Sequence, residues 1–220
     1  MPAEVDLHLH TTRSDGHLTP TELVRLLVSR GISIAAITDH DSTEGLDEAF
    51  AEASHYPELR LIAGIEMTAD LPDGTGDVHL LGYFLGYHDR SFQEHLLQFR
   101  EGRVNGAKMM VHKLAELGLP VDWQRVQSIA AGASVGRPHI AQAMVERGYI
   151  KSQKDAFKEY LQDGGKAHFA RPHILLADAV KLINSVGGVA VLAHPLYTKN
   201  YQDLIASLSK VGVVGIEAHY

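Results

Sequence analysis

Short apolar runs recur along the chain and predict a sheet of buried strands. Each run holds a handful of mostly aliphatic or β-branched residues, which is typical of strands covered on both faces. The runs are Glu4–Leu9, Ile32–Thr38, Leu59–Glu66, Val78–Leu85, Val189–His194 and Val213–Ala218.

Amphipathic segments between some of these runs predict helices. After the first run, Thr19 or Thr21 is placed to cap a helix with apolar residues at helical spacing, and Gly31 ends it. Asp178–Val186 has a similar pattern before the fifth run. Strands that alternate with helices predict an α/β fold with a parallel sheet or barrel.

The stretch 91–172 has helical patterns and almost no strand signal. Its predicted helices are Ser91–Leu117, Pro138–Arg147 and Gln153–Leu161. We therefore expect two parts, a sheet or barrel formed by 1–90 and 173–220, and a helical insertion formed by 91–172.

Composition limits the classes of protein that remain. The 220 residues are 45% hydrophobic and 21% charged, as in a globular protein, and the absence of cysteine excludes disulfide scaffolds, thiolate metal sites and cysteine nucleophiles. No apolar run approaches the ~18 residues of a membrane span and the N-terminus lacks a signal-peptide pattern, so a soluble cytoplasmic protein is expected. The net charge of −7 argues against binding long duplex nucleic acid through charge.

Ligand-type side chains stand at the ends of the predicted strands. The chain has 14 histidines, and histidine is the commonest metal-binding side chain. In a parallel α/β barrel the carboxyl ends of the strands meet on one face, where active sites lie. Alternation along a strand points His8 and His10 to the same side, as two ligands of one ion require. The candidates are His8, His10, His40, Glu66 and His194, with His79 near the start of the fourth strand.

Each candidate also has an ordinary structural interpretation. A lone histidine near a strand end, such as His79, is often a satisfied polar residue. Glu66 after an apolar run fits a helix cap, and Asp15 before Gly16 fits a turn. The number of ligand-type residues at strand ends favours a metal site over these separate explanations.

Four ordered motifs closely resemble those of the PHP (polymerase and histidinol phosphatase) family. They are Asp6-Leu7-His8-Leu9-His10 with the following residues to Gly16, Thr38-Asp39-His40-Asp41, Gly64-Ile65-Glu66 and Ala193-His194-Pro195. The resemblance implies a distorted, TIM-like (β/α)7 barrel. Gly136-Arg137-Pro138-His139 in the insertion resembles the branch that contains nucleoside 3′,5′-bisphosphate phosphatases and 5′-3′ exoribonucleases.

The resemblance also implies up to three divalent ions, with manganese favoured over zinc or iron. It assigns His8, His10 and Glu66 to the first ion, Glu66, His79 and His194 to the second, and Asp15 and His40 to the third. Asp39 and Asp41 are expected to orient histidine rings. Water between two such ions loses a proton near neutral pH, so the expected nucleophile is a hydroxide that two ions share.

Arginines in the insertion are candidates for binding phosphate, for which they supply a planar fork of donors. Arg100 and Arg103 are three residues apart and share a helix face. This spacing alone is as typical of a solvated helix face as of a phosphate-binding pair. The family resemblance favours phosphate binding by both, and by Arg137 and His139. We therefore expect a substrate-binding cap and a metal-dependent phosphoric ester hydrolase that acts on nucleoside 3′,5′-bisphosphates or on the 5′ ends of short oligonucleotides.

One part of the family pattern is missing. The family has a seventh strand that ends in a Gly-Ser-Asp-x-His-like motif and completes the first and third ion sites, but this sequence stops at Tyr220 without it. The expectation is a chain cut short or an open barrel, with the second site the most intact. Glu217 and His219 are candidates to replace the missing ligands.

Three other functions remain to be weighed. A metal-dependent amide hydrolase commonly bridges its ions with a carboxylated lysine, but the first lysine is Lys108 and Glu66 takes the bridging position. A small-metabolite phosphatase of the histidinol-phosphatase type shares the fold. The missing ligands also fit a catalytically silent metal-binding module.

Overall fold

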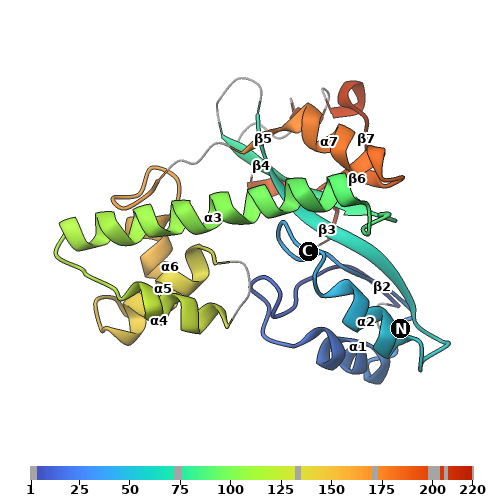
Figure 1. Ribbon diagram of the computed structural model, residues 1–220, viewed down its shortest axis with the longest axis horizontal. Coiled ribbons are helices and arrows are strands. Elements are labelled where there is room, and N and C mark those ends of the chain that lie inside the picture. The colour runs from blue at the N-terminus through green and yellow to red at the C-terminus, as the bar shows by residue number, and fades with distance from the viewer. Residues whose placement is uncertain are drawn as a thin grey trace. The chain divides into compact units, whose positions relative to one another are not determined.

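The computed structural model describes residues 4–71, 76–131, 135–169, 173–197, 204–205 and 208–219 of the chain. The chain divides into two compact units, 1–96 with 172–220 and 97–171. The first unit contains the sheet and the second is helical (Figure 1). In the described residues, no helix is both long and apolar enough to cross a membrane.

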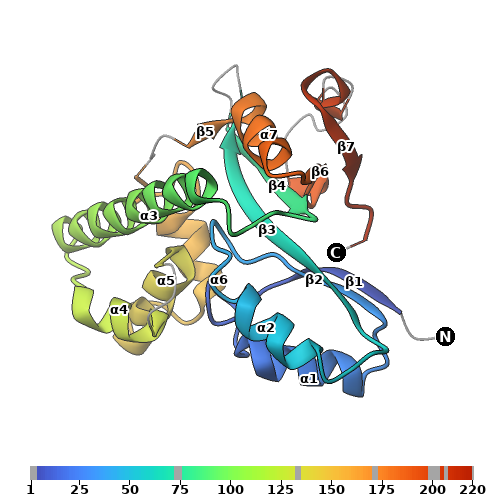
Figure 2. The ribbon, with the colours of Figure 1, turned by 45° about the vertical axis from the view of Figure 1, so that its right-hand side comes forward.

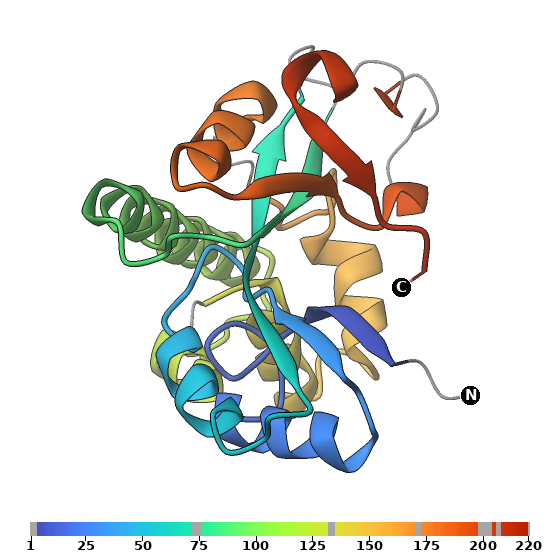
Figure 3. The same ribbon diagram turned by 90° about the vertical axis from the view of Figure 1, so that its right-hand side faces the viewer.

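The first unit is built on a curled sheet of seven strands, which Figures 2 and 3 show from two sides. The strands are β1 (Val5–Leu9), β2 (Ile34–Ile37), β3 (Arg60–Asp70), β4 (Asp77–Tyr83), β5 (Ile174–Leu175), β6 (Val189–Leu192) and β7 (Val213–Ile216). Their order is β1-β2-β3-β4-β6-β7, with β5 paired to β3. Within the described chain β1 and β7 do not pair with each other, so the sheet forms a half-barrel.

The expectation of a wholly parallel sheet is wrong for the fourth strand. β4 runs antiparallel to both β3 and β6, whereas β1, β2 and β3 are mutually parallel and β6 is parallel to β7. Residues 71–76 alone connect β3 to β4. A parallel crossover needs about a dozen residues or more, so this connection permits only an antiparallel return.

Strand β3 changes partner part-way along its length. Arg60–Ala63 pair with β2, and Gly64–Asp70 pair with β4. Gly64 stands at the change, where a Cβ atom would lie 2.7 Å from the carbonyl oxygen of Ile37 and from Cγ2 of Thr38. Glycine therefore permits the close approach of β2 that places its carboxyl end beside the next residues of β3.

Helices α1, α2 and α7 belong to the first unit. α1 (Pro20–Ser29) starts at a capping box formed by Thr19 and Glu22, which confirms the predicted Thr19 cap. α2 (Leu46–Ala53), which was not predicted, packs on α1 and β3, and α7 (Leu176–Ser185) packs on β3, β4 and β6. Ala36, Ile62, Leu81, Tyr83 and Ala193 form one buried cluster between the strands.

The second unit contains most of α3 (Arg90–Glu116), which begins in the first unit, followed by α4 (Trp123–Ala130), α5 (Arg137–Glu146), α6 (Gln153–Ala156) and a π-helix, Phe157–Leu161. Its core includes Leu114, Val126, Ile140, Met144 and Leu161. The predicted helices of this stretch are confirmed to within about one residue at their ends. The short helix α4 and the two-residue strand β5 were not predicted.

Candidate metal centre

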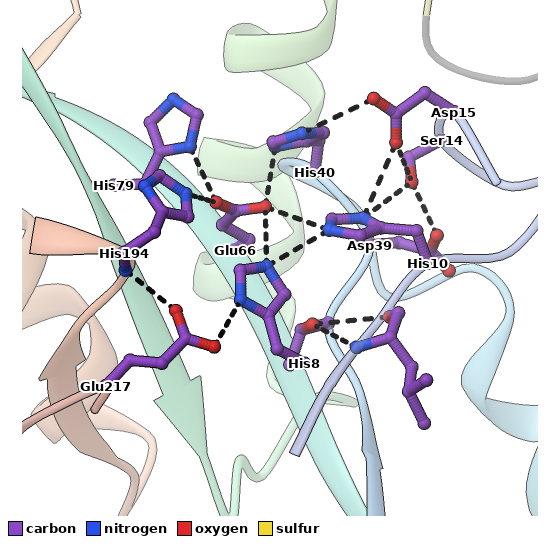
Figure 4. Close-up of polar contacts among 12 residues, drawn as sticks. His8, His10, Ser14, Asp15, Asp39, His40, Glu66, His79, His194 and Glu217 are labelled. Carbon is purple, nitrogen blue, oxygen red and sulfur yellow. Dashed lines mark hydrogen bonds and ion pairs between the residues drawn. The ribbon is translucent and has the colours of Figure 1, made fainter. Parts of the chain in front are cut away.

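A single buried carboxylate lies at the centre of a ring of histidines (Figure 4). Glu66, in the middle of β3, is 1% exposed. Its Oε1 atom lies 2.6 Å from His79 Nδ1 and 2.9 Å from His194 Nε2. The nitrogens beside its Oε2 atom are His8 Nε2 at 3.2 Å, His10 Nε2 at 3.1 Å and His40 Nδ1 at 3.2 Å.

The surroundings of Glu66 Oε2 fit a divalent cation. Within the described chain this buried oxygen makes no hydrogen bond of normal geometry, although three imidazole nitrogens surround it. Nε2 of His8 lies 3.1 Å from Nε2 of His10, so two ring nitrogens converge on the same space. Neighbouring ligands of an ion with bonds of about 2.1 Å lie about 3.0–3.4 Å apart. An ion between these groups would match the spacing and satisfy the buried oxygen.

A second side of the cluster is formed by Asp15. Its Oδ1 lies 3.5 Å from His10 Nδ1 and its Oδ2 lies 3.6 Å from His40 Nε2. The rings of His10 and His40 therefore each direct one nitrogen toward Glu66 and the other toward Asp15. In the described residues, the groups whose ligand atoms lie within 4.8 Å of one another are His8, His10 and Glu66; His10, Asp15 and His40; and His40, Glu66 and His79.

The structure brings the predicted metal ligands together in one cluster. These are His8, His10, Asp15, His40, Glu66, His79 and His194. The division of ligands among ions is less sharp than expected, because His10 and His40 each lie between the Glu66 side and the Asp15 side. Binding of ions by these residues stays a prediction.

Backbone hydrogen bonds between β3 and the end of β2 position His40. The Asp41 amide donates to the Glu66 carbonyl oxygen at 2.9 Å, and the Glu66 amide donates to the Asp39 carbonyl oxygen at 3.2 Å. Asp41 has φ of 48°, in the left-handed region that non-glycine residues rarely adopt. This local strain turns the chain directly after His40, and such strain concentrates at functional sites.

Asp39 contacts the loop beside the cluster. Its buried carboxylate accepts hydrogen bonds from the Thr11 amide at 2.7 Å, from Thr11 Oγ1 at 2.6 Å and from Ser14 Oγ at 2.6 Å. Ser14 Oγ in turn lies 3.3 Å from His10 Nδ1. Asp39 therefore reaches His10 through Ser14, and its expected role in orienting a histidine ring stays a prediction.

Glu217 lies behind the cluster, not among the ligand groups. Its Oε1 lies 2.9 Å from His8 Nδ1, and its Oε2 accepts a 2.7 Å hydrogen bond from the His194 amide. The sequence suggested Glu217 only as a replacement ligand, yet no ligand group within the described residues includes it. His219 is exposed and belongs to none of these groups either.

Neighbouring carboxylates favour the protonated forms of His8 and His10. Burial lowers the pKa of His8, but Glu66 and Glu217 together outweigh it and raise the pKa to about 9. Burial likewise opposes the charged form of His10, and Glu66 and Asp15 raise its pKa. Burial raises the pKa of Glu66, yet His40 and the other imidazoles hold it well below its usual range. Glu66 is therefore ionised at neutral pH.

The predicted phosphate-binding residues lie in the second unit, Arg137 and His139 in the first turn of α5 and Arg100 and Arg103 on α3. His139 Nδ1 accepts a hydrogen bond from the Gly136 amide at 3.0 Å, and a Cβ on Gly136 would lie 3.8 Å from Nη1 of Arg103. Arg137 Nη1 donates to Asp163 Oδ1 at 3.0 Å. Arg100 precedes Arg103 by about one turn of α3. Asp163 and His168 were not predicted as site residues, and Nε2 of His168 lies 3.3 Å from the same Asp163 oxygen.

A family model for the PHP domain matches residues 6–210. This chain belongs to the PHP domain family. The matched region contains all seven predicted metal ligands, which agrees with the resemblance seen in the sequence, whereas Glu217 lies beyond it.

Curated relatives of this PHP domain act on RNA and nucleotides. The chain is 34% identical to a 5′-3′ exoribonuclease, Rnm, of Salmonella typhimurium over 86% of its own length and 64% of the relative. It is 32% identical to a 3′,5′-nucleoside bisphosphate phosphatase of Chromobacterium violaceum over 98% of its own length and 76% of the relative. The chain thus spans about two thirds to three quarters of the length of these relatives.

Solved structures share the fold of this PHP domain. A candidate metal-dependent phosphoesterase from Bifidobacterium adolescentis has a TM-score of 0.87 and 29% identity, over 97% of this chain and 76% of that one. A Chromobacterium violaceum protein described as an amidohydrolase, with sulfate and without metal, has a TM-score of 0.88 and 31% identity over the same shares. The two descriptions name different hydrolase classes, so the chemistry has to be argued from the site.

Proposed function

We propose that this PHP domain is a metal-dependent phosphoesterase that acts on nucleoside 3′,5′-bisphosphates or on the 5′ ends of short oligonucleotides. The observation that carries the proposal is the arrangement around Glu66, whose two oxygens contact different histidines. A carboxylate that has metal-binding side chains beside each of its two oxygens is suited to bridge two ions. Two neighbouring ions are a common means of stabilising both the attacking and the leaving oxygen in phosphoryl transfer.

The donor set defines the ions that fit. One ion would be held by His8, His10 and Glu66, and a second by Glu66, His79 and His194. A third would be held by Asp15 and His40. The rings of His10 and His40 lie between the third site and the first. Imidazole and carboxylate donors without sulfur suit Mn²⁺, Zn²⁺ or Fe²⁺. When bound, such ions polarise the phosphoryl oxygens and lower the pKa of coordinated water.

The residues of the chain have separate tasks in this reaction. Glu66 remains ionised because the surrounding imidazoles lower its pKa, so it presents two anionic oxygens to ions. The histidines would bind in their neutral form. The second nitrogen of His8 contacts Glu217, and that of His10 lies beside Ser14. The guanidinium groups of Arg100, Arg103 and Arg137, with His139, would bind the substrate phosphates.

The fold supports a more specific architecture. We infer that the half-barrel is part of a distorted (β/α)7 barrel and that the helical stretch 91–172 is the substrate-binding cap. An amide hydrolase of this type commonly bridges its ions with a carboxylated lysine, but no lysine precedes Lys108 in the chain, so the early strands of the cluster contain none. Glu66 takes the bridging position instead, which favours the phosphoesterase.

A substrate panel tests the proposal. The chain, loaded with Mn²⁺, is incubated separately with adenosine 3′,5′-bisphosphate, a 5′-phosphorylated RNA trimer, histidinol phosphate and a cyclic amide, and product release is measured with and without EDTA. We expect metal-dependent hydrolysis of the first two. Faster turnover of histidinol phosphate or of the amide would replace the proposed substrate class, and binding of Mn²⁺ without turnover of any of the four would indicate a silent metal-binding module.

A further inference from the structure

Glu217 connects the two ends of the half-barrel through the candidate metal centre. It follows β7, at the opposite end of the sheet from β1, and its own amide donates to the Leu192 carbonyl oxygen of β6 at 2.8 Å. Its side chain is 9% exposed. From this position one carboxylate oxygen contacts His8 of β1 and the other contacts the backbone of His194 after β6 (Figure 4).

The contact with Glu217 determines the tautomer of His8, and therefore whether the ring nitrogen that faces the cluster has a free lone pair. A carboxylate accepts hydrogen bonds only, so a neutral His8 places its proton on Nδ1, toward Glu217 Oε1. Nε2, which lies 3.2 Å from Glu66 Oε2, is then free of a proton and is directed at the ion position. A carboxylate on the outer nitrogen of a metal-binding histidine fixes the tautomer and increases the basicity of the ligand.

The contact with His194 fixes a strained backbone. His194 has φ of 26°, outside the regions that a residue with a side chain normally adopts. The hydrogen bond from its amide to Glu217 Oε2 holds this conformation, in which the ring reaches Glu66 Oε1 at 2.9 Å. Glu217 thus contacts both His8, which lies beside Oε2 of Glu66, and His194, which lies beside Oε1.

We propose that Glu217 is a positioning residue that sets His8 and His194 for two different ions on the two sides of Glu66. The inference rests on the proposed metal centre. It requires a carboxylate specifically, because each of the two contacts needs an acceptor. A glutamine at this position has one acceptor oxygen and one donor NH₂ group, so it loses at least one of the two contacts.

The test compares Glu217→Gln with Glu52→Gln in the 220-residue chain. Glu52 is a matched control because its carboxylate also accepts several hydrogen bonds, from Arg25 and Tyr56, but contacts no residue of the cluster. Zn²⁺ affinity is measured by competition with a chromophoric chelator, and folding by circular dichroism. We expect the affinity of Glu217→Gln to fall by roughly 10–100-fold and that of Glu52→Gln to match the wild type.

Two further measurements separate positioning from general destabilisation. In the Zn²⁺-loaded wild type, ¹⁵N-resolved NMR of the imidazoles should show a slowly exchanging proton on His8 Nδ1, which becomes rapidly exchanging in Glu217→Gln. In a His8→Ala background, the loss of affinity caused by Glu217→Gln should shrink, since part of it acts through His8. If Glu217→Gln does not fold, Glu217→Asp, which keeps both acceptor oxygens on a shorter side chain, takes its place in each measurement.

The outcomes distinguish this inference from the proposed function. Zn²⁺ affinity in a folded Glu217 variant equal to that of the wild type, or an unchanged His8 Nδ1 proton, overturns the role of Glu217 and leaves the metal centre intact. A wild-type chain that binds neither Zn²⁺ nor Mn²⁺ overturns both.

Discussion

Nδ1 of His79 lies 2.6 Å from Oε1 of Glu66, although the strands that carry them run in opposite directions. In the register of β3 and β4, His79 stands opposite Thr68, which is two residues beyond Glu66. Residues two apart in a strand share a face. The reversal of β4 therefore brings a residue near the start of one strand onto the same face as a carboxylate in the middle of its neighbour.

His79→Ala is expected to remove one ion and leave the others. His79 contacts Glu66 Oε1, whereas His8 and His10 approach Oε2, so the loss of His79 empties one side of the bridge. Metal content measured by inductively coupled plasma mass spectrometry should fall by about one ion per chain, and turnover by roughly 100-fold or more. His112→Ala, an exposed histidine in the second unit, is the control and should retain full metal content. An unchanged content in His79→Ala would remove this residue from the site.

Stability of the metal-free chain should depend on pH in a specific direction. The folded-state pKa of His8, about 9, exceeds the usual 6.5, so its protonated form stabilises the fold fully below pH 6.5, and this stabilisation is lost as the pH rises toward 9. Thermal unfolding in EDTA should therefore show a melting temperature that falls between pH 6.5 and 9, and the fall should be smaller in His8→Ala. A melting temperature that rises across this interval would contradict the protonation assigned to His8.

Metal binding should have the opposite pH dependence. An ion competes with protons for the histidines, since only the neutral ring coordinates. Affinity for Mn²⁺ should increase as the pH rises from 7 to 9, with release of protons on binding, by about tenfold per pH unit for each proton released. Isothermal titration calorimetry in buffers of different ionisation enthalpy counts these protons, and a count of zero at pH 7 would show that the rings are already neutral.

Arg137→Ala should weaken substrate binding without changing metal content. If Arg137 binds a substrate phosphate, its loss raises KM for adenosine 3′,5′-bisphosphate by roughly 10-fold, as for a charge-assisted hydrogen bond. Asp163→Asn should do the reverse and lower KM, because Asp163 occupies the same guanidinium at 3.0 Å. Arg125→Ala, in which an exposed ion pair with Glu146 is lost, is the matched control. An unchanged KM in Arg137→Ala would remove this residue from the substrate site.

Gly64→Ala should destabilise the first unit. Its new Cβ would lie 2.7 Å from backbone and side-chain atoms of β2 and the residue after it, so the strands must separate at the point where β3 changes partner. We expect a loss of about 1–3 kcal/mol in urea unfolding. Gly215→Ala, whose Cβ would meet Val191 at an ordinary 3.5 Å, should cost much less. Equal effects would show that the close approach at Gly64 relaxes freely.

The elements that position the cluster were largely predictable because they have strong local signals. The buried runs of β1, β2 and β6 and the capped helix α1 were visible in the hydrophobic pattern. The direction of β4 was assigned wrongly from the general rhythm of strands and helices, although the short connection of residues 71–76 carried the correct signal. The strand β5 is two residues long, and no periodicity can reveal an element of that length.

The candidate site was predictable in its membership but not in its internal contacts. Histidines and carboxylates at strand ends identify themselves by type and position. Sequence spacing does not show which nitrogen of a ring faces which oxygen, and therefore it could not place His10 and His40 between two sides of the cluster. Glu217 is 209 residues from His8 along the chain, and only the curl of the sheet brings them to 2.9 Å.

The most direct test of the metal centre compares Glu66→Gln with Glu52→Gln in the Mn²⁺-dependent release of phosphate from adenosine 3′,5′-bisphosphate. Glutamine has the shape of glutamate, but its neutral amide places an NH₂ donor on one side of the bridge. Phosphate release by Glu66→Gln should therefore fall to the level measured with EDTA. The control should retain wild-type turnover. Turnover in a folded Glu66→Gln chain similar to that of the control would contradict a reaction centred on Glu66.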